Sequence, residues 1–326
     1  MYVPDFRFRR LRRTQTLRSL VQETHLQSTD FVLPIFVEED IREPVVVASM
    51  PGVFRYPEDQ LAQRVKAAWS AGVRAVILFG VSTHKDDCGS DSWSEQGLMA
   101  RMLRTAKEAA PDMLVISDNC FCEYTEHGHC GMVAGDDVDN DKTLSNLQRQ
   151  VVVAARAGAD MIAPSGMMDG MIGAIREALD GAGFSHIPVM SYSTKFASAF
   201  YGPFRDAVDS TFKGTRASYQ MNPANGREAL AESMLDEAEG ADLLMVKPGM
   251  AYLDVLANIR QNSSLPLAVY QVSGEYAMIK ASAAAGVIDE KAVAMESLLA
   301  FKRAGADLII TYYALEAIEW LSQKHE

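Results

Sequence analysis

The 326-residue sequence predicts an α/β protein built as a (β/α)8 TIM barrel, and two observations lead to this fold. A short phrase recurs four times, with a helix-like segment, a glycine and then an apolar run; the glycines are Gly72, Gly158, Gly240 and Gly305. Glycine is common just beyond a helix because it adopts the left-handed backbone conformation without a steric penalty from Cβ. An apolar run of about four to eight residues after that glycine is typical of a strand buried on both faces.

Eight such apolar runs supply the expected strands. Four of them close the recurring phrases, at residues 70–80, 156–166, 239–249 and 303–313. The other four share the same unbroken apolar character, and they lie at 31–37, 113–119, 187–193 and 265–272.

Helical periodicity fills the intervals between these strands. The expected helices are 58–71, 94–109, 143–157, 170–182, 225–239, 251–261, 275–303 and 315–324, and the segment 275–303 is expected as two helices broken near Gly286. Eight alternations of strand and helix predict a parallel barrel. A doubly wound open sheet is the alternative, but no Gly-x-Gly-x-x-Gly turn follows the first strand. We therefore expect one barrel domain over residues 29–326 and an N-terminal arm over residues 1–28.

Charge and cysteine content narrow the range of functions. The net charge of −12 disfavours a nucleic-acid partner, because phosphate binding requires a basic surface. Six arginines between Arg7 and Arg18 are the exception, and we interpret them as a solvated or subunit-contacting arm, with a nucleic-acid tail or a transit peptide as alternatives. No apolar stretch is long enough to span a membrane. Four cysteines without a secretory signal indicate a reduced, cytoplasmic protein in which a disulfide is disfavoured.

Two lysines close neighbouring strands of the predicted barrel, at the end where such barrels carry their chemistry. Burial lowers the pKa of a lysine, and a second ammonium nearby lowers it further. A neutral amine can attack a ketone to form a Schiff base, so Lys195 and Lys247 are candidate nucleophiles. Asp118, Ser273 and Tyr312 follow other strands and are expected at the same mouth. The alternative for either lysine is a charge that reaches solvent or pairs with a carboxylate.

Three cysteines follow the third strand in the stretch "CFCEYTEHGHC", as Cys120, Cys122 and Cys130. Three thiolates suit zinc. A site with only these ligands keeps an open position for water or substrate, which is the catalytic arrangement, whereas His127 or His129 could close it as a structural site. An unmetallated cluster is the third possibility.

The segment 196–224 is long for a connection between a strand and a helix, and long loops in compact domains are often lids. It carries Arg205, Lys213, Arg216 and Gln220. Arginine binds a carboxylate through two parallel hydrogen bonds, so a lid with arginines suits a substrate that carries a carboxylate. Ordinary surface charge is the alternative for each arginine.

Several of these motifs resemble the porphobilinogen synthase (5-aminolevulinate dehydratase) family, and the resemblance runs nearly end to end. "GADLLMVKPGMAYLD" looks like the Schiff-base lysine signature of the family, and "MSYSTKFASAFYGPFR" and "YQVSGEYAMIKA" are equally specific. "SDNCFCEYTEHGHCG" looks like the zinc-type form of the metal loop. The resemblance implies a barrel with an arm that wraps a neighbouring subunit, a cytoplasmic homo-octamer, and no organic cofactor. The implied reaction, early in heme biosynthesis, is a hydro-lyase reaction that joins two 5-aminolevulinate molecules into porphobilinogen.

The resemblance also implies a role for individual residues. Lys247 would hold the substrate that supplies the propionate side of the product (the P site), and Lys195 the one that supplies the acetate side (the A site). Asp118 would assist proton transfer between them. The remaining implied roles are zinc binding by Cys120, Cys122 and Cys130, A-site carboxylate binding by Arg205, Arg216 and Gln220, P-site carboxylate binding by Ser273 and Tyr312, and contact with a regulatory magnesium by Glu232. A Schiff-base aldolase with a structural zinc and an inactive zinc-holding scaffold are the alternatives.

Overall fold

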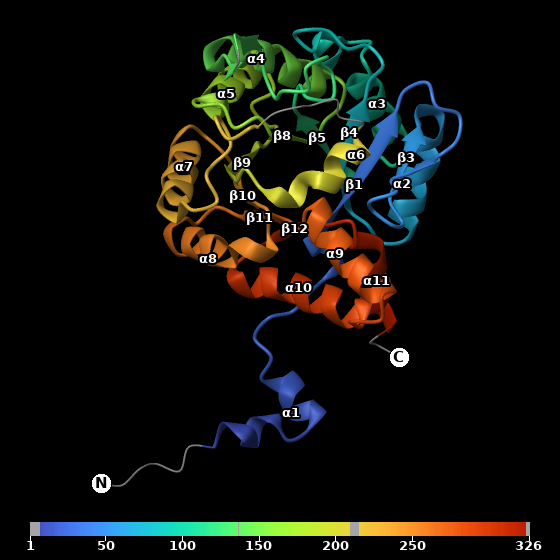
Figure 1. Ribbon diagram of the computed structural model, residues 1–326, viewed down its shortest axis with the longest axis vertical. Helices are drawn as coiled ribbons and strands as arrows, with labels where there is room; N and C mark the ends of the chain where they lie inside the picture. Colours follow the sequence, from blue (N-terminus) through green and yellow to red (C-terminus); the bar gives the residue numbers. More distant parts are fainter. Residues whose placement is uncertain (1–6, 136, 209–214, 324–326) are drawn as a thin grey trace.

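A nearly closed barrel of parallel strands forms the centre of the molecule, in a computed structural model that describes residues 7–135, 137–208 and 215–323 (Figure 1). The eight barrel strands are β1 (Phe31–Glu38), β4 (Ala75–Val81), β5 (Leu114–Asn119), β8 (Met161–Pro164), β9 (Met190–Lys195), β10 (Leu243–Lys247), β11 (Leu267–Tyr270) and β12 (Leu308–Ile310). Their order around the ring is β8-β5-β4-β1-β12-β11-β10-β9. A single parallel bridge between Ile162 and Val189 joins the two ends of this order, so the predicted barrel is confirmed.

Helices surround the barrel, as the sequence predicts (Figure 1). They are α2 (Leu61–Ser70), α3 (Leu98–Ala109), α4 (Asn140–Arg156), α5 (Met171–Gly181), α7 (Gly226–Ala238), α8 (Leu253–Asn262), α9 (Ser273–Ala284), α10 (Glu290–Ala304) and α11 (Ala314–Ser322). The segment 275–303 divides into α9 and α10, and Gly286 between them has φ +71°, a left-handed conformation that favours glycine.

Each strand is buried on both faces, which explains its unbroken apolar sequence. Inward side chains such as Ile116 and Met245 pack together inside the ring. Outward side chains such as Val115 and Leu244 belong to a second cluster that includes buried residues of the surrounding helices. Because residues of one strand alternate between these two clusters, the parity of a strand decides which side chains enter the barrel.

Several short elements lie outside the sequence-based prediction. They are the 3-10 helices η1 (Phe8–Arg12), η2 (Ser28–Asp30), η4 (Ser90–Trp93) and η5 (Ala199–Tyr201), the helices α1 (Gln15–Leu20) and α6 (Gly202–Ala207), and the strands β2 (Val45–Val46), β3 (Phe54–Pro57), β6 (Val133–Ala134) and β7 (Asp137–Val138). The helices expected at 58–71 and 251–261 begin as the 3-10 turns η3 (Glu58–Gln60) and η6 (Met250–Tyr252). Elements of two to six residues carry too little periodicity to be recognised from sequence. The expected long loop at 196–224 thus contains two of them, η5 and α6.

The segment before β1 projects away from the barrel and carries α1 (Figure 1). Phe8 and Leu20 on it are 74% and 76% exposed, so this part of the chain buries little apolar surface by itself. Within the described residues, no helix is both long enough and apolar enough to cross a membrane.

Candidate active site

The two candidate lysines end adjacent strands and lie side by side. Lys195 closes β9, Lys247 closes β10, and the two residues are register partners in the parallel ladder. Each side chain is only 5% exposed. Lys247 lies two residues beyond the inward-facing Met245, so it enters the barrel by simple alternation.

Lys195 reaches the barrel interior through an irregularity in β9. Leu244 pairs with Ser191, but Val246 pairs with Thr194, so β9 has one more residue than β10 over this stretch. Such a bulge reverses the parity of the strand beyond it. Tyr192 and Lys195 are three residues apart, and the bulge allows both to face the interior.

Aromatic rings surround the Lys247 amine. Its Nζ lies 4.2 Å from the centroid of the Tyr270 ring, 5.0 Å from that of Tyr192 and 5.3 Å from that of Phe204. Burial, helped by the neighbouring Lys195 and opposed by the carboxylate of Asp118, lowers the pKa of Lys247 to about 7. A substantial fraction of the amine is therefore neutral near neutral pH, as a nucleophile requires.

Asp118, the fifth residue of β5, points inward beside the lysines. Its carboxylate accepts hydrogen bonds from the Tyr192 hydroxyl at 3.1 Å and from the Ser165 hydroxyl at 3.3 Å. Burial first, and then the nearby Glu123, raises the pKa of Asp118 to about 7. Lys195 donates to the backbone carbonyl of Ser165 at 2.5 Å, so the Ser165 segment holds both groups. The site thus contains an acid and an amine that both change charge near neutral pH.

Three thiols gather in the loop that follows β5. The sulfur atoms of Cys120, Cys122 and Cys130 lie within 4.8 Å of one another, and all three residues are buried. All four cysteines of the chain are free thiols, and Cys88 stands outside the cluster. Convergent sulfur ligands fit a soft or borderline metal such as zinc and do not fit magnesium or calcium. The cluster could therefore hold a metal.

The two histidines of this loop make hydrogen bonds within the protein. The His127 Nε2 atom lies 3.1 Å from the carbonyl oxygen of Asp87, and its Nδ1 accepts from the backbone N–H of His129. His129 Nδ1 lies 3.2 Å from the Tyr219 hydroxyl. Neither histidine belongs to the three-thiol cluster. Both are therefore better described as loop residues that form hydrogen bonds than as metal ligands.

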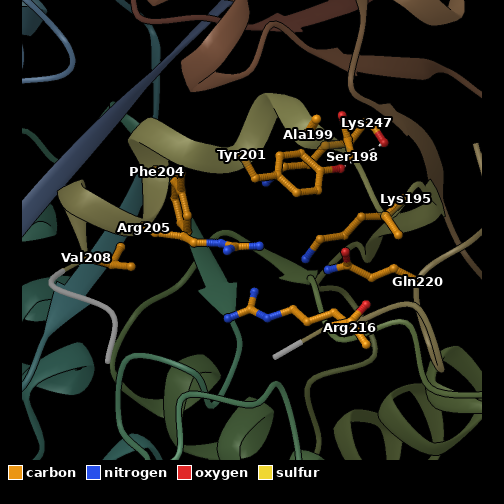
Figure 2. Close-up of a pocket in the computed structure, with 12 residues that line it drawn as sticks. Lys195, Ser198, Ala199, Tyr201, Phe204, Arg205, Val208, Arg216, Gln220 and Lys247 are labelled. Carbon is orange, nitrogen blue, oxygen red and sulfur yellow. Dashed lines mark hydrogen bonds between the residues drawn. The ribbon is translucent and has the colours of Figure 1, made fainter. Parts of the chain in front are cut away.

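A cavity of about 220 Å³ opens over the lysines, beneath α6. Figure 2 shows the side chains of Arg205, Arg216, Gln220 and Lys195 pointing into it, and Lys247 belongs to its lining. The Gln220 amide nitrogen is buried without a hydrogen-bond partner among the described residues, which leaves a donor for a ligand. The cavity is smaller than the roughly 300–1,000 Å³ typical of drug-sized ligands, so it suits a small polar molecule. Lys213, which the sequence also placed on the lid, lies outside the described residues.

The two other expected carboxylate ligands contact residues that surround Lys247. Tyr312 follows β12, and its hydroxyl lies 3.2 Å from that of Tyr270, which packs against the Lys247 amine. Ser273 begins α9, and its hydroxyl contacts the lid backbone at Phe204. The structure therefore places both residues around the lysine pocket.

Glu232 lies elsewhere, on the outer helix α7. It lines a groove with Asp137, Asp169 and Glu228. Burial, together with Asp169 and Glu228, raises the pKa of Glu232. Among the described residues, the only cluster of three or more possible metal ligands is the three-thiol group, so the magnesium prediction stays untested.

Sequence reasoning did not identify the aromatic residues that surround Lys247. Tyr192, Tyr270 and Phe204 all place a ring against its amine. Ser165, which the sequence places at the end of the fourth strand, contacts Asp118. The inward parity of β9 and β11 could have indicated the two tyrosines, but aromatic residues inside a barrel are more often packing residues than ligands. Only the contact with the Lys247 amine shows that these tyrosines are part of the site and not merely packing residues.

The fold and the site together define a (β/α)8-barrel enzyme whose reactive groups lie at the carboxyl ends of the strands. The model of the delta-aminolevulinic acid dehydratase family matches residues 5–320. A curated relative of that name from Escherichia coli K12 is 59% identical over 311 residues, which cover 95% of this chain and 96% of the relative. Another, from Synechococcus elongatus, is 49% identical and covers 98% of this chain and 99% of its own length.

A solved structure gives the same result in three dimensions. It is the delta-aminolevulinic acid dehydratase (porphobilinogen synthase) of Toxoplasma gondii in complex with the reaction product porphobilinogen. Its TM-score is 0.96 at 45% identity, with 99% of this chain and 93% of that chain covered. The chain therefore belongs to the delta-aminolevulinic acid dehydratase family and is a hydro-lyase, which confirms the family resemblance seen in its sequence.

Proposed function

We propose that this protein joins two molecules of 5-aminolevulinate into porphobilinogen with release of two waters, an early step of heme biosynthesis. The observation that carries the proposal is the pair of buried, register-matched lysines beneath a cavity with two arginines. A ketone substrate suits the amines, and a substrate carboxylate suits the arginines. The Toxoplasma gondii structure with porphobilinogen bound supports the same product.

Each lysine forms a Schiff base with one substrate, so the two ketone oxygens leave as the two waters. The resulting iminium withdraws electrons, and the carbon beside it loses a proton and attacks the second substrate. Asp118 accepts and returns that proton, because its pKa lies near 7 and its carboxylate, held by the Tyr192 hydroxyl, is close enough to both lysines to interact with their charges. The substrate amino group then displaces one lysine, and the other lysine leaves as the pyrrole forms. Both lysines are regenerated.

Two carboxylate sites orient the substrates. Ser273 and Tyr312 bind the carboxylate of the substrate held by Lys247, in the P site. Arg205, Arg216 and Gln220 bind the carboxylate of the substrate held by Lys195, in the A site. Two charged clamps fix which ends of the substrates meet, and such positioning supplies a large share of a bimolecular rate enhancement.

The thiols of Cys120, Cys122 and Cys130 hold zinc in this proposal. Zinc held by these three thiolates would supply a Lewis acid at the mouth of the barrel. Gln150 donates to the backbone carbonyl of Cys120 at 2.8 Å and fixes the start of the metal loop. The assignment of a regulatory magnesium to Glu232 rests on the family resemblance alone.

The same resemblance supports a cytoplasmic homo-octamer in which residues 1–28 form an arm that contacts a neighbouring subunit, separate from a barrel domain at 29–326. Exposed apolar side chains on the extension, at Phe8, Leu11 and Leu20, support a contact surface.

Pyrrole formation from 5-aminolevulinate, measured before and after chelation, tests the proposal. Product that disappears with the chelator and returns with zinc supports both the reaction and the metal. Product that survives complete zinc removal keeps the lysine chemistry and rejects a catalytic metal. No product from folded, zinc-loaded protein rejects the proposed reaction.

A further inference from the structure

The Ser273 hydroxyl connects α9 to the lid. Its Oγ accepts a hydrogen bond from the backbone N–H of Phe204 at 2.9 Å and donates to the backbone carbonyl of Phe200 at 3.3 Å. Phe200 lies in η5 and Phe204 in α6, and α6 crosses the centre of the strand ring in Figure 1. One buried hydroxyl therefore meets the lid backbone at two points.

Two further contacts seat the same lid segment. The Tyr201 hydroxyl donates to the backbone carbonyl of Lys247 at 3.2 Å. A Cβ atom at Gly274 would lie 2.5 Å from the carbonyl oxygen of Phe200, so only glycine permits this close approach. The lid thus rests on the start of α9 and on the end of β10, the two places that form the Lys247 pocket.

Arg205 follows Phe204 directly in α6. Its side chain enters the cavity over Lys195, as Figure 2 shows. Because one peptide unit joins the two residues, the position of the Phe204 N–H sets where the Arg205 side chain begins. A group that holds Phe204 therefore also positions Arg205.

We infer that Ser273 is a positioning residue that couples the two substrate sites: the hydroxyl that binds the first carboxylate also holds the lid helix that carries the arginine for the second. The inference rests on the proposed function, which places a substrate carboxylate at Ser273. A P-site substrate then prepares the A site through the contact between Ser273 and Phe204.

The hydrogen-bonding capacity of a hydroxyl explains the direction of the effect. Ser273 has one proton, which it now gives to Phe200 over a long 3.3 Å contact. A carboxylate is a stronger acceptor, since a charge-assisted hydrogen bond is roughly twice as strong as a neutral one. Donation to the carboxylate makes the Oγ atom a better acceptor for the Phe204 N–H, because hydrogen bonds in a chain polarise one another. The Phe200 carbonyl loses its long bond, and the shorter Phe204 bond becomes stronger.

Hydrogen exchange of the lid backbone tests this coupling in the full-length protein. Levulinate is a suitable probe because it has the ketone and carboxylate of the substrate but no amino group. Borohydride reduction and mass analysis report whether Lys247 has formed a Schiff base. We expect levulinate to slow exchange of the Phe204 amide within the peptide 200–208 by roughly twofold, because its existing hydrogen bond to Ser273 becomes stronger and no new bond forms.

Two variants separate coupling from simple binding. In Ser273→Ala we expect faster exchange at 200–208 without ligand and no protection by saturating levulinate, although Lys247 is still trapped. Tyr312→Phe removes the other proposed carboxylate ligand without touching the lid backbone. We expect it to require more levulinate but to reach full lid protection at saturation.

The outcomes that overturn the inference are distinct from a failure of the proposed function. Unchanged exchange at 200–208 in the wild type, with Lys247 fully trapped, rejects the coupling and leaves the lysine chemistry intact. Ligand-induced protection that persists in Ser273→Ala also rejects it. A wild-type protein in which levulinate never modifies Lys247 rejects the proposed function, and the coupling with it.

Discussion

Lys195 and Lys247 are neighbours in the same ladder, but their surroundings differ. Lys195 donates a hydrogen bond to the backbone carbonyl of Ser165. Lys247 faces aromatic rings, and the pKa of its amine is lowered to about 7 chiefly by burial. A buried amine without a full complement of acceptors loses more hydration than it regains. Lys247 is therefore the residue we expect to react first with a ketone.

This difference predicts the pH dependence of Schiff-base formation. Below a pH of about 7 the Lys247 side chain is mostly an ammonium ion. The rate at which the borohydride-trapped levulinate adduct forms should therefore fall roughly tenfold for each pH unit below that value, and it should level off above it. Asp118→Asn should move the midpoint downward, because the carboxylate raises the pKa of Lys247. A rate that keeps rising as the pH approaches the pKa of an ordinary lysine would contradict a lowered pKa for Lys247. Mass spectrometry of the trapped peptide supplies the measurement.

The thiol cluster makes a second prediction at the scale of single residues. Cys130→Ala removes one of three convergent sulfur ligands, so we expect bound zinc to fall to near background after dialysis. Cys88→Ala is the matched control, because Cys88 stands outside the cluster and its loss should leave the zinc content unchanged. Zinc content is measured by atomic absorption. Retention of zinc by Cys130→Ala would show that the metal lies elsewhere.

At the scale of elements, the site depends on how strand ends are held relative to one another. The buried carboxylate of Glu275 in α9 accepts from the backbone N–H groups of Val272 at 2.9 Å and of Met250 at 2.6 Å. It thereby ties the start of α9 to the loop that follows Lys247. This junction supports Ser273 on one side and the amine on the other.

Glu275→Gln should destabilise this junction. The amide keeps one acceptor oxygen but directs an N–H₂ group at a backbone N–H, which leaves a buried donor unsatisfied. We expect the free energy of unfolding to fall by about 1–3 kcal/mol, measured by urea denaturation. Glu296→Gln on the exposed face of α10 is the control and should stay within about 0.5 kcal/mol of the wild type. Equal effects of the two substitutions would mean that the Glu275 contacts contribute nothing.

The pKa of Glu275 gives that variant a pH signature. Burial raises it to about 7 from an ordinary value of 4.5, so the folded state binds a proton that the unfolded state has already released. Protonated Glu275 therefore contributes fully to the free energy of unfolding below pH 4.5, and this contribution is lost as the pH rises to about 7. This contribution should be absent in Glu275→Gln, which a comparison of urea midpoints across that range would detect.

At the scale of the whole molecule, the described part of the N-terminal extension exposes apolar side chains. Leu20 is 76% exposed and Val21 is 48% exposed, and the described part of the extension lies away from the barrel in Figure 1. Apolar side chains in such a position favour contact with another copy of the chain. The proposed octamer would bury them.

Removal of residues 1–28 should therefore lower the order of assembly. We expect the full-length protein to behave as an octamer in light scattering and the truncated protein as a smaller species with an intact barrel by circular dichroism. The double substitution Phe8→Ser and Leu20→Ser should have the same effect in milder form. An octamer that survives the truncation would place the subunit contacts on the barrel.

Much of this architecture is readable from sequence because it depends on local rules. Unbroken apolar runs mark strands that are buried on both faces, and glycines such as Gly158 and Gly305 adopt the positive φ expected after a helix. The polar residue that ends a barrel strand lies at the mouth regardless of its distant neighbours. For Asp118 and Lys247 even the inward direction follows from alternation, since each lies two residues beyond an inward apolar side chain.

The sequence alone determined the barrel and the residue types at its mouth, because periodicity and spacing are properties of the chain itself. Its motifs also indicated the family, through their resemblance to known members. Tertiary structure alone decided how those residues work together. The extra residue in β9 turns Lys195 inward, burial in the barrel mouth lowers the pKa of Lys247, and folding of the lid brings Phe204 to Ser273. These effects depend on burial and on contacts between segments far apart in the sequence, and both are set only when the whole chain packs.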